Sequence, residues 1–246
     1  MTEQSRNNLA VLIIGASSAI GQAMIEKYQS NLQISTIISI SQCAINYANT
    51  DKISHFVSDY SERSVCDIID ELNDWQGKIS EVIICNGQLH SNNIQPEKRL
   101  EDIDFAAMAA LFEINTLVPL RWIKHLLTLC QGTAPCKIVC LSARVGSIGD
   151  NQLGGWYSYR ASKAALNMAL KTAAVEYQRR AKNIKLIAFH PGTTDTPLSK
   201  PFQKNVKPEQ LFTPLQVADY LCTILQNCEL DGQLDYLDWA GKPIAW

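Results

Sequence analysis

Short apolar runs alternate with amphipathic stretches along this chain of 246 residues. The first run, Leu9 to Ile14, is continuously apolar, as in a parallel strand that helices cover on both faces. The pattern predicts further strands over residues 34–40, 55–58, 81–85, 137–141, 184–189 and 232–237. Because helical intervals separate them, we expect a single-domain, doubly wound parallel α/β sheet of about seven strands, with helices on both faces.

Helical periodicity predicts helices over residues 22–29, 61–75, 100–130, 157–181 and 214–226. Ser61 is a suitable N-cap, and Pro119 inside the long 100–130 interval predicts a kink there. Residues 41–50 look mostly like loop. Residues 193–213 hold three prolines and no clear periodicity, so we expect an irregular segment that serves as a substrate lid.

Composition indicates one soluble globular domain over residues 1–246, with 46% hydrophobic residues and a formal net charge of -2. The balanced charge, without a Lys/Arg run, argues against nucleic acid as a partner. The run Leu9 to Ile14 is too short to cross a membrane and ends in a glycine turn rather than a signal cleavage site. Eight scattered cysteines without a Cys-x-x-Cys pair favour free thiols in a reducing compartment, so we expect a cytoplasmic protein.

A glycine-rich turn, Gly15 to Gly21, joins the first strand to the first helix. Backbone amides at such a helix start can cradle a phosphate, and glycine allows the backbone to approach closely. We therefore expect a nucleotide there, held by Gly15, Ser17, Ser18, Ala19, Ile20 and Gly21. Asp59, after the third strand, is a candidate acceptor for an adenine amino group, although a plain turn aspartate is an equal alternative.

Tyr159 and Lys163 are four residues apart in a helical stretch, so they share one helix face. A tyrosine hydroxyl is a poor acid near neutrality because its ordinary pKa is about 10. A neighbouring ammonium would lower that pKa and make Tyr159 a proton donor. This spacing is common on helix surfaces, so the other motifs must decide whether the pair is functional.

Together these motifs resemble the short-chain dehydrogenase/reductase family, in particular its C-factor and sniffer-type carbonyl reductase branch. The similarity covers nearly the whole chain in the right order, although Ala19 replaces the middle glycine of the family's turn. Other matches are Asn86-Gly87, Asn115, the Tyr159/Lys163 pair, the run 154–167, the turn 190–196 and the ending 238–246.

The resemblance implies a nicotinamide cofactor bound at the carboxyl ends of the strands. Its pyrophosphate would lie at the glycine turn, its ribose near Gly87, and its carboxamide against the turn 191–196. The remaining implied cofactor residues are Ser41, Asn86, Tyr159, Lys163, Pro191, Gly192, Thr194 and Thr196. An acidic residue near Ser41-Gln42 would select NAD, and none is there, so we favour NADP over NAD.

The resemblance further implies four catalytic residues: Tyr159, Lys163, Asn115 and a serine that steadies the substrate oxygen. Asn115 would hold a water that links Lys163 to solvent, although without the family pattern a polar residue satisfied within its helix is the favoured interpretation. The family's serine lies three residues before a glycine, and here that position is Ala143. Ser142 is one residue earlier and would need a bulge to enter the site, and Ser147 is the next hydroxyl along the chain.

We therefore expect an NAD(P)-dependent oxidoreductase that acts on a small carbonyl or alcohol substrate. The alternative is a dinucleotide-binding signalling or regulatory protein whose turnover is incidental. The resemblance also implies a homodimer or homotetramer, formed by the helices around Asn115 and after Tyr157. His55, His90 and His125 have no partners at ligand spacing, so no metal site is expected, and we expect a structural role for His190.

Overall fold

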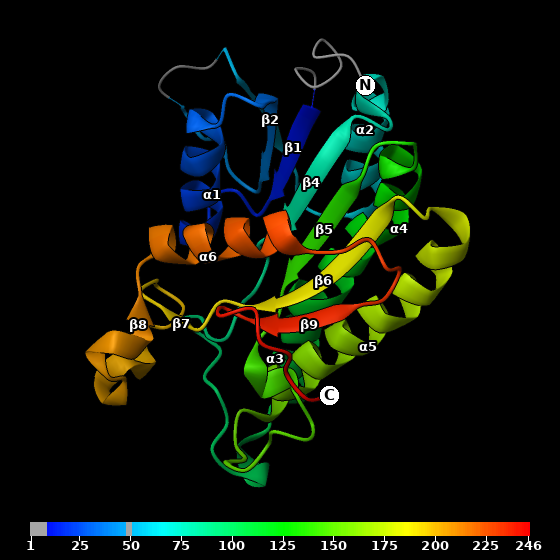
Figure 1. Cartoon of the computed structure of the whole chain (residues 1–246). Coiled ribbons are helices and arrows are strands. Elements are labelled where there is room, and N and C mark those ends of the chain that lie inside the picture. The colour runs from blue at the N-terminus through cyan, green and yellow to red at the C-terminus, as the bar shows by residue number, and fades with distance from the viewer. Residues whose placement is uncertain (1–8, 48–50) are drawn as a thin grey trace.

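A seven-stranded parallel sheet forms the centre of the molecule, in the order β3-β2-β1-β4-β5-β6-β9 (Figure 1). The computed structural model describes residues 9–47 and 51–246, so the expectations for residues 1–8 and 48–50 lie outside the described residues. The strands are β1 Leu9–Ile14, β2 Ile34–Ser41, β3 Ile53–Val57, β4 Ile79–Ile84, β5 Cys136–Leu141, β6 Ile184–His190 and β9 Asp235–Asp238. Every pairing is parallel, and the strand order reverses between β1 and β4, which confirms the predicted doubly wound sheet.

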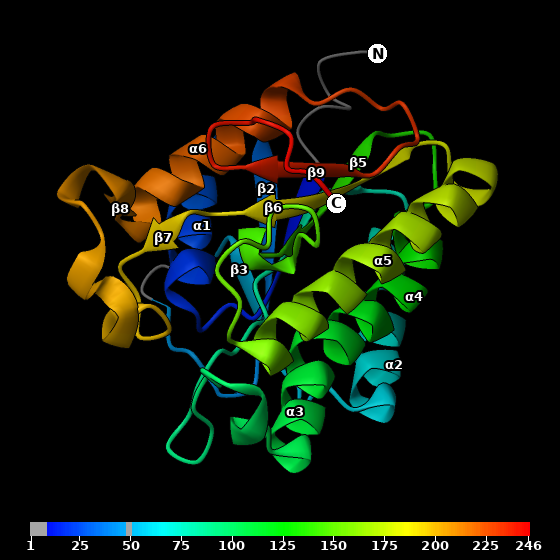
Figure 2. The same cartoon turned by 90° about the horizontal axis from the view of Figure 1, so that it is seen from below.

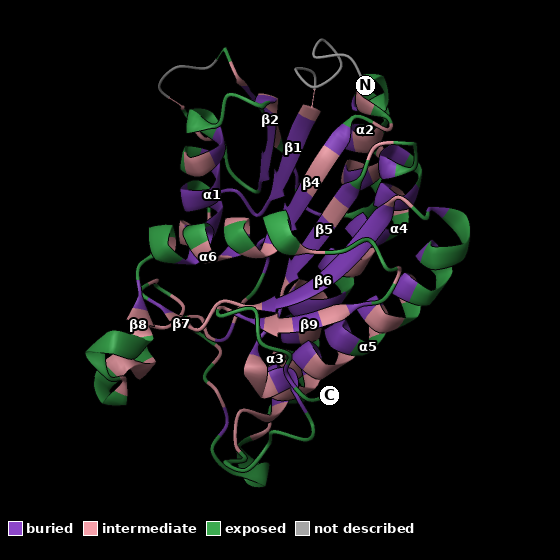
Figure 3. Ribbon diagram, viewed as in Figure 1, coloured by how far each residue is buried: buried purple, intermediate pink, exposed green. Residues whose placement is uncertain are grey.

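Helices cover both faces of this sheet (Figure 2). On one face lie α1 Ala19–Ser30 and α6 Pro214–Asn227, and on the other lie α2 Glu62–Glu71, α3 Phe105–Phe112, α4 Val118–Cys130 and α5 Tyr157–Arg180. Two buried apolar clusters, one on each face, pack α1 and α6 on one side and α2, α4 and α5 on the other against the strands, and Figure 3 shows the burial along these elements. α3 lies against α5. Short 3-10 helices occupy Asn73–Trp75, Leu100–Asp102, Arg144–Gly146, Lys200–Asn205 and Pro208–Gln210.

The predicted long helix over residues 100–130 is interrupted. A 3-10 turn precedes α3, and a π turn, Glu113–Leu117, joins α3 to α4. Pro119 accounts for the π turn, since it has no amide to donate to the carbonyl of Asn115 four residues earlier. The expected irregularity therefore falls one turn before the proline and places Asn115 inside the π turn.

The stretch Phe105–Cys130 is long and apolar enough, by length and composition alone, to cross a membrane. In this fold its buried residues, among them Trp122 and Leu126, belong to the core cluster shared with α2, α5 and the sheet. Core packing therefore accounts for much of its apolar character.

Residues 193–213 are more ordered than the sequence predicts. The two ends of this segment pair as short strands, β7 Thr193–Thr194 and β8 Leu211–Phe212, and two 3-10 helices lie between them. Because its ends meet, the segment forms a closed flap at the carboxyl edge of the sheet (Figure 1). Thr213 then caps α6 by accepting the amide of Gln216, with Pro214 in the first turn.

Candidate active site

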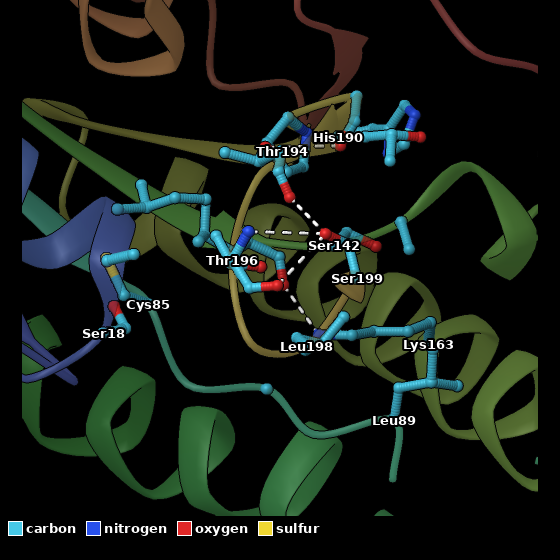
Figure 4. A pocket seen from close by; sticks show the side chains of 18 of the residues that line it. Ser18, Cys85, Leu89, Ser142, Lys163, His190, Thr194, Thr196, Leu198 and Ser199 are labelled. Carbon is cyan, nitrogen blue, oxygen red and sulfur yellow. Dashed lines mark hydrogen bonds between the residues drawn. The ribbon is translucent and has the colours of Figure 1, made fainter. Parts of the chain in front are cut away.

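Two adjoining cavities of about 480 Å³ each lie at the carboxyl ends of the strands. They share Ser17, Ser18, Cys85, Asn86, Gly87 and Leu89 in their walls, so they form two lobes of one elongated site. One lobe reaches Tyr159, and Figure 4 shows Lys163 and the flap residues Thr194 and Leu198 around it. The other lobe reaches Gln42, Asp59 and Tyr60, and Leu198 lines it too. An elongated two-lobed site at the switch point is the shape that a dinucleotide requires.

The glycine turn has the geometry of an anion cradle. Gly15 has a positive φ of 76°, and a Cβ on it would lie 3.1 Å from the amide nitrogen of Asn86. A Cβ on Gly21 would lie 2.8 Å from the carbonyl oxygen of Gly15, so only glycine fits there. Ser18 caps α1 by accepting the amide of Gly21 at 3.1 Å. Ser17, Ser18, Ala19 and Ile20 line the cavity at this positive helix end, as the sequence predicts.

At the far lobe the structure brings in Asp59 but not Ser41. Asp59 is exposed, lines the cavity and accepts the amide of Ser61 at 2.8 Å. Ser41 is fully buried, and its hydroxyl donates to the carbonyl of Cys43 at 2.5 Å. The prediction that Ser41 contacts the cofactor is therefore wrong by one residue. β2 extends through Ser41 and holds its side chain inside the fold, so the next residue, Gln42, reaches the cavity.

Asn86, Gly87 and Asn115 meet at the centre of the site. The Oδ1 atom of Asn86 is buried and has no hydrogen-bond partner among the described residues, which leaves an acceptor for a ligand hydroxyl or amide. Asn115 is fully buried, and its side chain exchanges two 2.8 Å hydrogen bonds with the backbone of Gln88. Its amide group also donates to Ser162 at 3.1 Å. Asn115 thus fixes the loop after β4 to α5, and its side chain has little capacity left for a water.

Tyr159 and Lys163 both project from the first turns of α5 into the same lobe. Lys163 is only 2% exposed, and its Nζ donates to the carbonyl of Leu141 at 2.8 Å. A Cβ on Gly87 would lie 3.5 Å from that Nζ, so the lysine sits directly beside the expected ribose position. The structure therefore places both side chains in the wall of one lobe, as their shared helix face predicts.

The prediction that Lys163 lowers the pKa of the Tyr159 hydroxyl is wrong. Burial raises the pKa of the Tyr159 hydroxyl, and the neighbouring Tyr236 raises it further. Burial lowers the pKa of the Lys163 ammonium to about 8. Tyr159 therefore keeps its proton at neutral pH, while Lys163 remains mostly charged.

Ser142 is buried and lines the lobe, as predicted, but its hydroxyl is already engaged. It donates to Oδ1 of Asn167 at 2.6 Å. Ala143, the next residue, packs instead with Tyr159 and Leu89. Ser147 is also buried and accepts the amide of Asp150 at 3.0 Å. Ala143 thus packs against Tyr159, and Ser142 lines the same lobe with its hydroxyl turned to Asn167, whereas Ser147 does not line the lobe.

The turn after β6 forms the wall opposite α5 (Figure 4). Gly192 has a φ of 74°, and a Cβ there would lie 2.7 Å from the ring of Phe212, so a side chain would displace the turn. Pro191, Gly192, Thr194 and Thr196 all line the lobe, as predicted. His190 lies there too, and burial lowers its pKa to about 4, so it is neutral.

An apolar wall next to Tyr159 was not predicted. Leu89 and Ala143 are buried against Tyr159, and four partly buried residues pack on them: Val145, Trp156, Leu198 and Phe202. The Trp156 ring lies 6.3 Å from that of Tyr159 and 5.0 Å from that of Phe202, measured between centroids. Of residues 146–156, which precede α5, only Trp156 lines the lobe.

Glu97 is a second residue that the sequence did not single out. Trp156 precedes α5 with a left-handed φ of 53° and makes no side-chain cap. The buried carboxylate of Glu97 takes that place, accepting the backbone amide of Ser158 at 3.3 Å and also its hydroxyl. A carboxylate from a distant segment therefore caps the helix that carries Tyr159.

Comparison with known proteins agrees with this geometry. The model of the short chain dehydrogenase family matches residues 9–207. The chain is 33% identical over 147 residues to the C-signal protein of Myxococcus xanthus, and the alignment covers 60% of this chain and 83% of that protein. A short-chain dehydrogenase/reductase of Burkholderia multivorans with bound NADP superposes with a TM-score of 0.80 at 20% identity, over 97% of this chain and 100% of the other. The carbonyl reductase Sniffer of D. melanogaster also gives 0.80, at 18% identity, over 97% and 99% of the two chains.

Proposed function

We propose that this chain, which belongs to the short-chain dehydrogenase/reductase family of oxidoreductases, reduces an apolar carbonyl compound with Tyr159 as the proton donor. The observation that carries the proposal is the position of Tyr159 and Lys163, which face the same elongated cavity as the glycine turn. The similarity to the C-signal protein had kept a signalling role open, and the intact pair favours the enzyme.

The residues present fit a nicotinamide dinucleotide, the cofactor class of this family. The turn at Gly15 and Gly21 and the start of α1 would hold the pyrophosphate, and Asn86 offers an unpaired acceptor. When bound, the cofactor supplies the hydride. We favour NADP because Gln42 occupies the position from which a carboxylate would repel a 2′-phosphate. The NADP-bound relative from Burkholderia multivorans supports this choice.

Tyr159 donates its proton to the oxygen of the substrate carbonyl as that oxygen becomes negative. Its raised pKa keeps the hydroxyl protonated until the substrate needs the proton. Lys163, held beside the site by the carbonyl of Leu141, stabilises the negative charge that then develops on the tyrosine oxygen. The flap and the aromatic wall exclude water, which strengthens these charge interactions.

The substrate that fits best is an uncharged carbonyl compound with an aryl or bulky alkyl flank. Its flank would lie against Trp156, Phe202 and Leu198, which stand next to Tyr159. Arg144, which also lines this lobe, is paired with Asp238 at 3.0 Å and Asp150 at 3.6 Å, so it is a poor partner for a substrate carboxylate. We also propose that residues 193–213 act as the lid over this pocket.

The test has two stages. Calorimetric titrations with NADPH and NADH come first, and we expect NADPH to bind at least as tightly. A clear preference for NADH would contradict the cofactor choice. Uncharged aryl ketones and keto acids of matched size then follow, with NADPH oxidation recorded by absorbance. Turnover of the aryl ketones is expected. Cofactor binding without hydride transfer to any carbonyl would favour the regulatory alternative.

We further propose that the protein works in a reducing compartment such as the cytoplasm. All eight cysteines are free thiols within the described residues, and three of them, Cys85, Cys136 and Cys140, are buried with raised pKa values.

A further inference from the structure

Three potential metal ligands meet on the surface between α2 and α4, away from the cavities described above. Glu62 and Cys66 lie one turn apart on α2, and His125 faces them from α4. The Sγ of Cys66 is 3.6 Å from Nε2 of His125, and the same nitrogen is 3.0 Å from Oε1 of Glu62. The three ligand atoms all lie within 4.8 Å of one another. Figure 2 shows α2 and α4 side by side on this face of the sheet.

These separations are close to those of a tetrahedral zinc centre. With the usual bond lengths, a thiolate sulfur and an imidazole nitrogen bound to one zinc are about 3.5 Å apart, and a nitrogen and a carboxylate oxygen about 3.3 Å. The first two separations thus agree with those of a zinc centre to within about 0.3 Å, and the carboxylate of Glu62 lies within 4.8 Å of the Cys66 sulfur, so a side-chain adjustment of Glu62 would complete the set. Three protein ligands leave the fourth position for water, as in other zinc sites with three protein ligands.

The site is also accessible and its geometry is supported by the backbone. The side chain of His125 is 20% exposed and that of Glu62 is 48% exposed, so a cation can enter without unfolding. Cys66 and Glu62 are fixed by their i, i+4 spacing on one helix face. Contacts between α2 and α4, which share Val65 and Trp122 in one core cluster, hold the two elements together.

Lys124 competes with a metal ion for the carboxylate of Glu62. Its Nζ pairs with Oε1 of Glu62 at 2.5 Å, and this contact lowers the pKa of the Glu62 carboxyl. The side chain of Lys124 is 63% exposed, so it can swing into solvent at small cost when a divalent ion replaces it. Arg63 and Asp67, which flank the cluster on α2, pair with each other at 3.8 Å.

We propose that Glu62, Cys66 and His125 form a binding site for a borderline-soft divalent cation such as Zn²⁺. No sequence motif marks this cluster, because 59 residues separate Cys66 from His125 and only the packing of α2 on α4 brings them together. The mixed sulfur, nitrogen and oxygen set disfavours Mg²⁺ and Ca²⁺, which prefer oxygen ligands alone.

Cobalt(II), a spectroscopic substitute for zinc, provides the direct test on the full chain after treatment with a chelator. We expect one tightly bound Co²⁺ per chain, with thiolate-to-cobalt charge-transfer absorption that Zn²⁺ displaces. Cys66→Ser should abolish that absorption, and His125→Gln should weaken binding about 10-fold or more. Lys124→Ala should strengthen binding, because it removes the competitor for Glu62.

Cys43→Ser is the matched control, since Cys43 is an exposed thiol outside the cluster. It should bind cobalt as the parent does. Absence of thiolate absorption in the parent, or equal binding by the parent and Cys66→Ser, would overturn the proposal. The substituted side chains are partly exposed, and far-ultraviolet circular dichroism of the metal-free variants will verify that each is folded.

Discussion

The Ser142 hydroxyl donates a 2.6 Å hydrogen bond to Oδ1 of Asn167 and so joins the end of β5 to the middle of α5. Ser142→Ala would leave the Asn167 oxygen buried without this donor. We expect the free energy of unfolding to fall by about 1–3 kcal/mol. The catalytic rate should change less than the 10 to 1,000-fold expected for a lost oxyanion donor. Urea unfolding and steady-state kinetics on the same samples will separate the two effects.

Ala143→Ser is the matched comparison, because Ala143 packs directly against Tyr159. A hydroxyl there should raise the catalytic rate, by about 10-fold if it reaches the substrate oxygen. If Ser142→Ala instead loses activity at unchanged stability, Ser142 holds the substrate oxygen after all. A loss confined to Ser147→Ala would assign that role to Ser147.

Glu97→Ala should destabilise the protein and reduce catalysis together. The buried carboxylate caps α5 through Ser158, one residue before Tyr159. Its removal leaves the first turn without that partner, and we expect a loss of about 1–2 kcal/mol in the free energy of unfolding. We also expect a lower kcat, since Tyr159 loses its fixed position. Chemical denaturation and saturation kinetics measure the two quantities.

Glu101→Ala is the control for that experiment, because Glu101 is an exposed carboxylate whose pairing with Arg99 is long, at 3.9 Å. Both quantities should stay near those of the parent. Glu97→Gln, which keeps an acceptor for the Ser158 amide, should recover part of the lost rate. If Glu97→Ala keeps both the free energy of unfolding and the kcat of the parent, the cap has no role in stability or catalysis.

The reductive rate should fall as the pH rises through about 8. Burial lowers the pKa of Lys163 from its ordinary value of 10.5 to about 8, so the ammonium is charged below that pH and neutral above it. Tyr159 keeps its proton throughout this range, because its own pKa is raised. The lost ammonium no longer stabilises the negative tyrosine oxygen, which slows proton donation.

Single-turnover rates over about two pH units on either side of that pKa will check this profile. The guanidinium of Lys163→Arg stays charged at every accessible pH. The rate of this variant should therefore not fall as the pH rises through 8, whatever its absolute value. A parent rate that rises steadily through pH 8 would contradict the assignment of Lys163.

We expect the chain to form homodimers or homotetramers through α3, α4 and α5. Large apolar side chains are exposed on this side of the molecule: Phe105 at 77%, Met168 at 69%, Leu117 at 45% and Val175 at 43%. Burial of these groups against a second copy would remove them from water. Light scattering at micromolar concentration should give at least twice the 27.4 kDa chain mass. Met168→Glu should lower that mass, whereas a parent that is only monomeric would refute the assembly.

The fold followed from the sequence because its information is local. Continuous apolar runs marked the parallel strands, and Ser18, Ser61 and Thr213 cap the helices that the periodicity indicates. The errors occurred at the ends of elements. The third and fourth strands begin at Ile53 and Ile79, two residues before their predicted starts. β2 ends at Ser41, one residue after its predicted end, and this smaller error assigned Ser41 to a cavity that Gln42 reaches.

The site was predictable only where a motif is contiguous. Tyr159 and Lys163 share a helix face, and Gly15 to Gly21 form one turn, so each motif can be found from its spacing, and their occurrence together in one chain points to a site. The apolar wall joins Leu89, Trp156 and Phe202, which are far apart in the chain. The Glu97 cap spans 61 residues, and no local pattern marks such a contact. These features arise from the packing of distant segments, and only the folded chain reveals them.

The rate of hydride transfer by Tyr159→Phe tests the central proposal most directly. The substitution removes the hydroxyl and keeps the ring that packs against Leu89 and Trp156. We expect NADPH affinity to remain that of the parent, while the single-turnover rate with an aryl ketone falls by about 100-fold or more, the contribution of a lost general acid. A variant that binds NADPH and reduces the ketone as fast as the parent would show that Tyr159 is not the proton donor.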